Sequence, residues 1–596
     1  DFLTGAWDYT SPASVPSTFV DHFSFTLVDG DNDRTAATAL DITVPKSNLP
    51  VANNDIILTN FDGVAFDVPE WAFLANDTDP NALPLDISGV SNQSDLVVTH
   101  TAGAGTNDFI RIDDENNADG GSFDYTATNG SLSDTGSVTV FNINGGGNVN
   151  GTAANEILVG DGNGNTFNGL GGMDIILAGG GDDTIVADQN DLVIDGGSGT
   201  DTLSVSVNFN DVGDSQITGI EDVLLTAGGL TLILDQQTEG FNVTGSSGAD
   251  NITTGSGNDT IAAMAGVDAI DSGGGSDTIV ENAVVGTSSD SGRVNNAGSG
   301  NDTGQDTVTG FDFSNDILRI DATNVNSFTH GIDTTIGTAG GTDSGVASSF
   351  TTTTGLINLN HNGTFGDSGD VAVTFASPIG TFDEANFEAR LQYHITGSGG
   401  GDTITTGQLD DMIDGGAGSD ILNGGAGADS VTGGTGEDII FMDTSDILID
   451  GGSNQNNDLL TVGNRGDVMV VSGTNNFTAL GDNYQNIETL SMLNADGSTG
   501  NSTVTLDIAD VLQMADTGHA GSLGVGYSDR PALRVDGDAG DVVNLDNSTG
   551  TWLLATGATG VPAGYTAYSH VTSGGVPTTN EDAYVMVATG VTVNLV

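Results

Sequence analysis

The sequence predicts an all-β protein in which short repeated units each fold as a turn followed by a short strand. Three observations support this: a nine-residue period, 90 glycines among 596 residues, and many Thr, Val and Ile residues. The period is clearest from Gly397 to Phe441, where the units are GSGGGDTIT, TGQLDDMID, GGAGSDILN, GGAGADSVT and GGTGEDIIF. Glycine allows the tight turn, and the three residues that end each unit are enough for a minimal strand.

Each of these units carries an aspartate at position six and an aliphatic residue at position eight. The aspartates are Asp402, Asp411, Asp420, Asp429 and Asp438. Stacked units would place such carboxylates about one strand spacing, ~4.8 Å, apart, where they repel one another unless a cation lies between them. The few aliphatic side chains are too small a core to offset that repulsion. Oxygen donors without nearby His or Cys favour calcium over zinc or copper.

These units resemble the RTX (hemolysin-type) calcium-binding nonapeptide, Gly-Gly-x-Gly-x-Asp-x-aliphatic-x. The resemblance implies a parallel β-roll with several Ca2+ ions held between successive turns on each edge. It also implies that the ligands are the position-six carboxylates and backbone carbonyls.

Two further arrays have the same period. In 151–186 position six holds Glu156, Asn165, Asp174 and Asp183, and the single unit 196–204 adds Asp201. In 245–280 position six holds Asp250, Asp259, Asp268 and Asp277. We expect all the aspartates of the three arrays to be metal ligands. We expect little binding at the two degenerate units of Glu156 and Asn165, and weak binding at 263–271, which lacks the leading glycines.

The N-terminal part predicts immunoglobulin-like β-sandwich modules. Residues 1–48 are interpreted as the end of one module with an acidic turn at 29–33, and residues 49–144 as a full module. Both resemble the cadherin-like and VCBS-type modules of large bacterial surface proteins. That resemblance implies calcium at acidic loops near module junctions, at Asp55, Asp77, Asp79, Asp113 and Asp114; alternatively, these residues are solvated turn residues.

The remaining chain divides into four predicted segments. They are a first roll with a β extension (145–240), a second roll with a β cap and insertion (241–395), a third roll (396–462) and a C-terminal β domain (463–596) that resembles a type I secretion region. The segments 217–235 and 484–512 resemble each other, so roll plus strand pair is an internal repeat. A helix is predicted from Asp383 to His394, capped by Asp383 and covering the open end of the third roll.

Composition limits the possible partners. The chain has 82 acidic and 9 basic residues, a net charge of −73, which excludes unaided binding to nucleic acid or to an anionic membrane. It contains no cysteine, as expected of an extracellular protein stabilised by metal rather than by disulfides. No apolar run reaches the ~20 residues of a membrane-spanning helix. We expect the chain to begin inside a longer protein.

The sequence carries no recognisable catalytic motif, so we expect no enzyme activity. The pentamer GDSGD at 366–370 is similar to a serine-peptidase loop, but Asp370 replaces its last glycine and no matching histidine segment is present. A β-turn is the better interpretation of this pentamer.

Together these patterns predict a secreted calcium-binding protein of the bacterial cell surface, an adhesin or matrix protein, with a carbohydrate or protein ligand that the sequence does not identify. Two alternatives stay open. One is a self-assembling surface-layer or filament protein with calcium-dependent self-association, and the other is the secretion module of an exported hydrolase.

Overall fold

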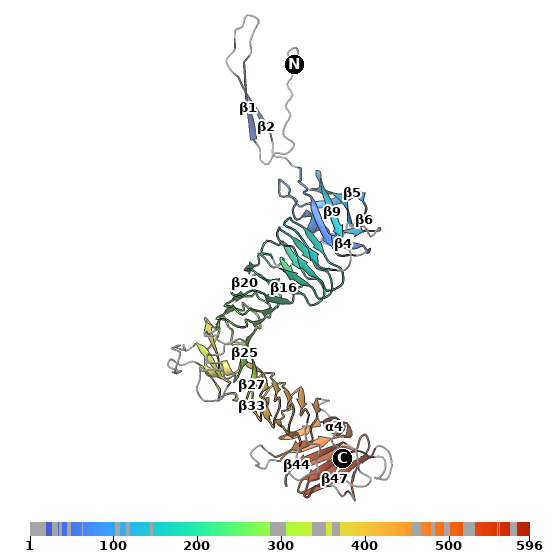
Figure 1. The fold of residues 1–596 in the computed structure, drawn as a ribbon, viewed down its shortest axis with the longest axis vertical. Helices are drawn as coiled ribbons and strands as arrows, with labels where there is room; N and C mark the ends of the chain where they lie inside the picture. Colours follow the sequence, from blue (N-terminus) through green and yellow to red (C-terminus); the bar gives the residue numbers. More distant parts are fainter. Residues whose placement is uncertain are drawn as a thin grey trace. The chain divides into compact units, whose positions relative to one another are not determined.

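The computed structural model is built almost entirely of β-strands, which confirms the all-β prediction (Figure 1). It divides into two units, Asp1–Val223 and Leu224–Val596. The structure describes residues 19–26, 34, 38–44, 49–61, 63–101, 108–114, 120–142, 147–186, 188–285, 306–336, 353–359, 370–453, 466–477, 483–493, 501–515, 531–556, 558, 561–571 and 581–596. The predicted acidic turn at 29–33 and residues 366–369 of the GDSGD pentamer lie outside this set.

The first unit begins with an antiparallel pair of strands, β1 (Phe19–Phe25) and β2 (Thr38–Val44). A module with two sheets follows. One sheet has the order β4-β7-β6 and the other includes β3-β9-β8-β5. The elements are β3 (Asp55–Thr59), β4 (Phe66–Pro69), α1 (Glu70–Leu74), β5 (Asp86–Ser94), β6 (Val97–Thr101), β7 (Phe109–Asp113), β8 (Gly120–Thr128) and β9 (Ser133–Asn142).

The two sheets of this module share one hydrophobic core. Phe73 of α1 lies at its centre, with its ring 6.1 Å from that of Phe123 and 6.0 Å from that of Tyr125. The core continues into the first roll, because β3 pairs in parallel with a roll strand and Ile57 lies opposite Ile157. β3 of the predicted module and β11 of the predicted first roll therefore belong to one sheet.

The first roll is a stack of very short parallel strands. Odd and even repeats alternate between two sheets, β10-β12-β14-β16 and β18-β15-β13-β11. Its strands are β10 (Val149–Asn150), β11 (Ile157–Val159), β12 (Thr166–Asn168), β13 (Ile175–Leu177), β14 (Thr184–Val186), β15 (Val193–Asp195), β16 (Thr202–Val205), β17 (Phe209–Asn210) and β18 (Ile217–Thr218). Ile176 pairs with Ile194, 18 residues later, so one coil of the roll contains two nonapeptides.

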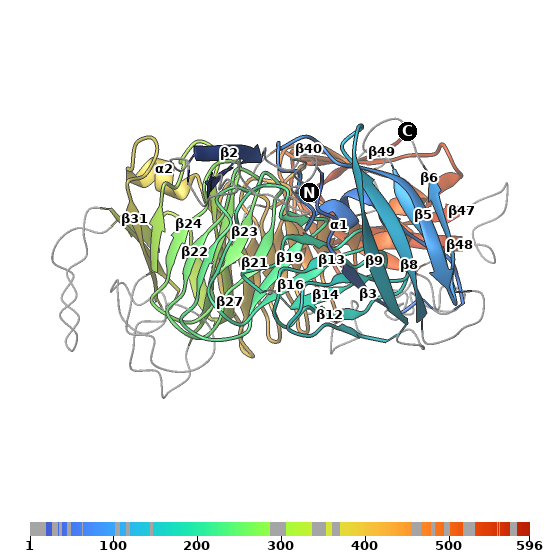
Figure 2. The ribbon, with the colours of Figure 1, turned by 90° about the horizontal axis from the view of Figure 1, so that it is seen from above.

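The second unit continues this architecture along two long series of strands. One has the order β21-β23-β25-β27-β32-β34-β36-β38-β41, and the other includes β20-β22-β24-β26-β31-β30-β29. Strands β22, β24 and β31 of the second series are at the left of the view in Figure 2. The strands of the second roll and its insertion are β19 (Asp222–Leu225), β20 (Thr231–Ile233), β21 (Asn242–Thr244), β22 (Asn251–Thr253), β23 (Thr260–Ala262), β24 (Ala269–Asp271), β25 (Thr278–Val284), β26 (Asp306–Thr309), β27 (Ile317–Val325), β28 (Ser327–Thr329), β29 (Thr334–Ile336), β30 (Thr354–Asn358) and β31 (Asp370–Ala376).

The third roll and the C-terminal region share sheets. The order β28-β33-β35-β37-β39-β42-β44-β48-β47-β46 runs through both, and β40-β43-β45-β49 forms a further parallel sheet. The strands are β32 (Leu391–Gly397), β33 (Thr403–Thr405), β34 (Met412–Asp414), β35 (Ile421–Asn423), β36 (Ser430–Thr432), β37 (Ile439–Phe441), β38 (Leu448–Asp450), β39 (Val468–Val470), β40 (Thr474–Asn476), β41 (Tyr484–Gln485), β42 (Thr489–Ser491), β43 (Thr503–Leu506), β44 (Ala532–Asp536), β45 (Val542–Leu545), β46 (Thr551–Leu554), β47 (Tyr565–Val571), β48 (Glu581–Ala588) and β49 (Thr592–Leu595).

The predicted boundary at 395/396 falls within β32, and the one at 462/463 lies outside the described residues. β32 pairs in parallel with β34, and β37 pairs in parallel with β39. Described strands on the two sides of each boundary therefore pair within shared sheets.

The glycines of the repeat are required by the backbone. In the unit that starts at Gly415, Gly416 and Gly418 have φ values of 89° and 126°, which a side chain disfavours. In the unit 263–271, Met264 stands where other units have a glycine and is held at φ 73°. The local strain at Met264 gives a physical reason for the predicted weakness of that unit.

The helix predicted from Asp383 to His394 is mostly wrong. Asp383 does cap a helix, since its Oδ1 accepts a hydrogen bond from the backbone N–H of Asn386 at 2.9 Å, but that helix, α2, spans only Glu384–Glu388. From Leu391 the side chains alternate between buried and half-buried, which is the period of a strand. This segment, β32, is a rung of the roll and pairs with β27 and β34, so it does not cover an open end.

A further helix that the sequence analysis missed, α4 (Ile508–Met514), begins at a capping box formed by Asp507 and Asp510. Among the described residues, no helix is both long and apolar enough to cross a membrane.

Candidate metal sites

The twelve predicted ligands occupy equivalent places in the fold. Each lies in the turn immediately before a short strand, and each has at most 2% of its surface exposed. They are Asp174, Asp183, Asp201, Asp250, Asp259, Asp268, Asp277, Asp402, Asp411, Asp420, Asp429 and Asp438. The aliphatic residue at position eight, two residues later, is buried in the roll interior, as Leu422 and Ile440 illustrate. Its burial fixes where the strand begins.

Carboxylates that lie 18 residues apart are connected through the backbone. In the third roll the N–H of Asp402 donates to Oδ1 of Asp420, and the N–H of Asp420 donates to Oδ1 of Asp438, both at 2.8 Å. On the other edge the N–H of Asp411 donates to Oδ1 of Asp429 at 2.8 Å. Consecutive repeats therefore contribute to opposite edges, and the stacking neighbour is the second repeat along the chain.

The first two rolls contain the same ladders. The N–H of Asp183 donates to Oδ1 of Asp201 at 2.7 Å, and that of Asp259 donates to Oδ1 of Asp277 at 3.0 Å. The unit around Asp201 is thus a regular rung and not an isolated repeat.

Most of these carboxylates have a second oxygen that the protein leaves unsatisfied. Among the described residues, a buried Oδ2 that accepts no hydrogen bond is found in Asp174, Asp183, Asp201, Asp259, Asp277, Asp420, Asp429 and Asp438. A buried charged oxygen without a partner is costly. These oxygens are therefore suited to a cation.

A glycine keeps space open beside these oxygens. A Cβ at Gly415, position one of its unit, would lie 2.6 Å from Oδ2 of Asp420, and a Cβ at Gly433 would lie 2.5 Å from Oδ2 of Asp438. The first glycine of the repeat therefore leaves room for the carboxylate, whereas the glycines at the second and fourth positions allow the positive φ of the turn.

Three of the predicted ligands differ from the others. Asp411 accepts hydrogen bonds from the N–H groups of Tyr393 and Gly407 at 2.7 and 2.9 Å, so both of its oxygens are satisfied. Asp402 is satisfied by the N–H and hydroxyl of Ser398, and Asp250 by the N–H groups of Leu230 and Ser246. These three carboxylates lie in the first unit or two of their arrays and need a cation less.

The degenerate units satisfy their position-six groups in the same way. Both carboxylate oxygens of Glu156 accept hydrogen bonds from Thr152. Oδ1 of Asn165 accepts a hydrogen bond from Asn60 at 2.6 Å, within the same unit of the structure. Both position-six groups therefore have hydrogen-bond partners within the protein.

Burial also perturbs the ionisation of the ladder. It raises the pKa of Asp420 and of Asp438 to about 6, with the charges of neighbouring aspartates adding to the effect at Asp420. The same cause raises the pKa of Asp183 to about 6 and that of Asp411 to about 7. Between about pH 4 and pH 6 the metal-free fold therefore binds protons at these groups that the unfolded chain has released.

We therefore expect acid to stabilise the metal-free fold. Because the folded pKa values lie above the unfolded value of 3.8, the folded chain binds more protons between about pH 4 and pH 7, and its stability falls as pH rises through that window. Calcium-stripped protein should regain part of its β signal in far-UV circular dichroism on acidification from pH 8 to pH 5. The measurement is repeated in high salt, which screens surface repulsion more than buried charge. A pH response that high salt abolishes would contradict the prediction.

Ladder carboxylates outside the regular arrays were missed by the sequence analysis. The N–H of Asp438 donates to Oδ1 of Asp467 at 2.8 Å, and the N–H of Asp467 donates to Oε2 of Glu488 at 2.8 Å, which extends that edge into the C-terminal region. In the second roll Asp306 and Asp316 accept from Asp268 and Asp277 at 2.8 and 3.1 Å. Each of these residues lies two positions before a buried aliphatic residue, as in the repeat, but without the glycines of the repeat. This spacing was the signal by which the sequence could have revealed them.

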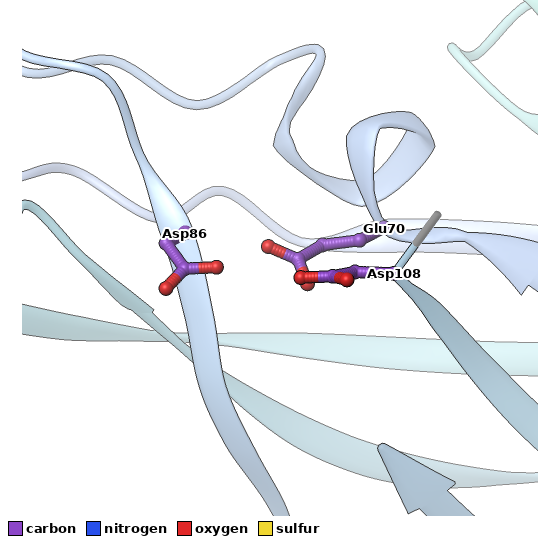
Figure 3. A group of neighbouring side chains, drawn as sticks. All are labelled: Glu70, Asp86 and Asp108. Atoms are coloured by element: carbon purple, nitrogen blue, oxygen red, sulfur yellow. The ribbon is translucent and has the colours of Figure 1, made fainter. Parts of the chain in front are cut away.

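The N-terminal module holds two acidic clusters. Asp55 is buried, its Oδ1 accepts from Asn76 at 2.8 Å, and burial followed by the charge of Asp77 raises its pKa to about 8. Of the other loop residues predicted there, Asp79 accepts the N–H of Asn81 at 2.7 Å as a turn residue, while Asp113 ends β7 and Asp114 is buried directly after it. A separate group, Glu70, Asp86 and Asp108, has ligand atoms within 4.8 Å of one another (Figure 3).

Two basic side chains in the described part of the chain pair with carboxylates outside the predicted ligand set. Arg319 binds Asp321 at 2.9 Å and Arg534 binds Asp536 at 2.8 Å, neither of them a predicted ligand. The ladders thus offer carboxylate and carbonyl oxygens as metal ligands. Hard cations such as calcium prefer this set of ligands.

Comparison with known families agrees with this geometry. The model of the RTX calcium-binding nonapeptide repeat matches residues 150–185, 168–203, 244–279, 396–431 and 405–440. No curated protein matches the chain. RTX repeats bind calcium and are typical of proteins exported by type I secretion. The matched residues contain all twelve predicted ligands, so these parts of the chain are RTX calcium-binding repeats.

Proposed function

We propose that the chain belongs to an extracellular, non-enzymatic bacterial surface protein, an adhesin or matrix protein, whose rolls fold and stiffen on binding calcium after export. The observation that carries the proposal is the pair of carboxylate ladders on each roll, with buried oxygens that lack partners. In the cytosol, where calcium is scarce, the chain would stay unfolded, which suits export. Outside the cell, calcium completes it.

The order of the modules supports the adhesin role. A two-sheet module is followed without a linker by the first roll, and rolls are quasi-one-dimensional elements that suit an extended tether. The ligand would be a carbohydrate or a protein on another surface.

A surface-layer or filament protein is the competing proposal, and the acidity of the chain favours it. Calcium could bridge the acidic surfaces of a chain with net charge −73 and so replace apolar contacts. Lattice interfaces otherwise bury about 1,200 Å² or more with an apolar centre, and only 6% of the residues here are aromatic.

We expect the purified chain to stay monomeric at micromolar concentration in millimolar calcium. Sedimentation velocity with and without calcium measures this directly, with magnesium at equal concentration as the ionic control. Growth into sheets or fibres on addition of calcium would replace the adhesin proposal with the assembly one.

A further inference from the structure

The two-sheet module, formed by the described residues between 49 and 142, supplies a strand on which the first roll stacks. β3 of the module pairs in parallel with β11, in the same register that β11 uses toward β13. Leu58 of β3 lies opposite Leu158, which is fully buried in the roll interior. The first coil of the roll, residues 151–168, therefore has a paired strand on its N-terminal side.

The outer face of the roll at this end packs against the core of the module. Ile157, Val159 and Ile175 lie on that face, because alternate residues of a strand point to opposite sides. All three are at most 4% exposed and belong to the same hydrophobic cluster as Phe73. In a regular rung such as β36 only the middle residue is buried. Apolar burial per rung is therefore larger at this end than in a regular part of a roll.

A buried asparagine of the module pairs with the end of the roll. Asn60 follows β3 directly and is 0% exposed. Its Oδ1 accepts the N–H of Asp161 at 2.9 Å, and its Nδ2 donates to the carbonyl of Gly147 at 3.0 Å and to Oδ1 of Asn165 at 2.6 Å. One side chain of the module thus satisfies three polar groups of the roll.

The first coil also lacks the unsatisfied carboxylates of the later coils. Its position-six groups are Glu156, whose oxygens accept from Thr152, and the uncharged Asn165. Neither has a buried side-chain oxygen without a hydrogen-bond partner in the described structure. The first coil is therefore held by the module and by its own hydrogen bonds and does not need a cation.

The backbone of the first coil positions the first two aspartates of the roll. The N–H of Glu156 donates to Oδ1 of Asp174 at 2.8 Å, and the N–H of Asn165 donates to Oδ1 of Asp183 at 2.6 Å. Oδ2 of each aspartate is buried and has no hydrogen-bond partner among the described residues. A folded first coil thus holds one oxygen of each carboxylate in place and leaves the other for a cation.

We propose that the two-sheet module and the first coil form a calcium-independent template, and that calcium folds the rest of the first roll onto it, from the module outward. In a quasi-one-dimensional stack each coil contacts only its neighbours, so a coil that is already folded favours the folding of the next one. The proposal rests on the proposed calcium-coupled folding and adds where that folding begins. It also gives a role to the degenerate units of Glu156 and Asn165, which fold before calcium is bound.

Hydrogen–deuterium exchange of the full chain, followed by mass spectrometry from excess chelator to millimolar calcium, tests the proposal. In chelator, we expect peptides from β8, β9, β11 and β12 to stay protected. Peptides from β34 to β37 of the third roll should exchange as fast as an unfolded chain. Peptides from β13 to β16 should gain protection only when calcium is added.

Asn60→Ala tests the contact between the module and the roll. It leaves buried groups of the roll without partners, which costs about a factor of ten or more in the opening equilibrium. Peptides from β11 and β12 should therefore exchange about tenfold or more faster in chelator, while those of the third roll are unchanged. The matched control is Asn190→Ala, an exposed asparagine of the same roll whose Nδ2 donates to Asp188 at 3.1 Å, and it should match the wild type.

Loss of protection at β11 and β12 of the wild type in chelator, together with the third roll, would overturn the template. Equal exchange of these strands in Asn60→Ala and in the wild type would overturn it as well. If Asn60→Ala unfolds the module itself, seen as fast exchange of β8 and β9 in saturating calcium, the wild-type measurement decides. A third roll that stays protected in chelator would instead overturn the proposed calcium-coupled function.

Discussion

Removal of calcium is expected to convert most of the β signal of this protein in far-UV circular dichroism into that of a disordered chain. In the rolls each strand is only about three residues long and buries one or two aliphatic side chains, so hydrophobic burial is small relative to the entropy lost on ordering. This small gain is opposed by the ladders of buried carboxylates, such as Asp420 and Asp438. Without a cation, their repulsion and desolvation favour unfolding.

The control for this experiment is magnesium. Its small octahedral shell dehydrates reluctantly and suits oxygen donors fixed on a roll edge less well than calcium does. Magnesium at the same concentration should therefore fail to restore the β signal after chelation. A spectrum that stays unchanged in excess chelator would show that the rolls are stable by themselves and would contradict the calcium-coupled mechanism.

The second large effect is expected from Asp420→Asn. Asp420 lies in the middle of a ladder, its Oδ2 is unsatisfied among the described residues, and its Oδ1 accepts from the N–H of Asp402. Asparagine keeps the volume and an acceptor oxygen but removes the charge that a cation needs on both sides. Loss of one site that is saturated a hundredfold costs about 2.7 kcal/mol, or about a hundredfold in the folding equilibrium.

A calcium titration followed by circular dichroism measures this effect as a shift of the folding midpoint to higher calcium. The matched control is Asp414→Asn in the same roll, an exposed aspartate whose Oδ1 accepts only the local N–H of Gly416 among the described hydrogen bonds. Asn165→Ala is a second control, because it removes a buried hydrogen bond with Asn60 without removing a ligand. Equal midpoints for Asp420→Asn and Asp414→Asn would refute the assignment of Asp420 as a ligand.

Much of the fold and of the candidate site follows from the sequence, because the repeat is local. A glycine that takes positive φ, an aspartate and a buried aliphatic at fixed spacing specify one turn and one strand, and the twelve predicted ligands all occupy that turn. The alternation of Leu391, Tyr393 and Ile395 also predicts a strand, but the capping signal at Asp383 favoured a helix. A short helix and a strand coexist there, since the cap acts on one turn only.

What the sequence determined by itself was the repeat unit, its ligand type and the excess of negative charge that requires a cation. The tertiary structure alone decided which carboxylates stack, because two nonapeptides make one coil and the partner of Asp420 is Asp438 rather than Asp429. It also decided that Asp467 and Glu488 extend the ladder. Inserted residues between rungs break the period along the chain, but parallel strand pairing restores the register in space.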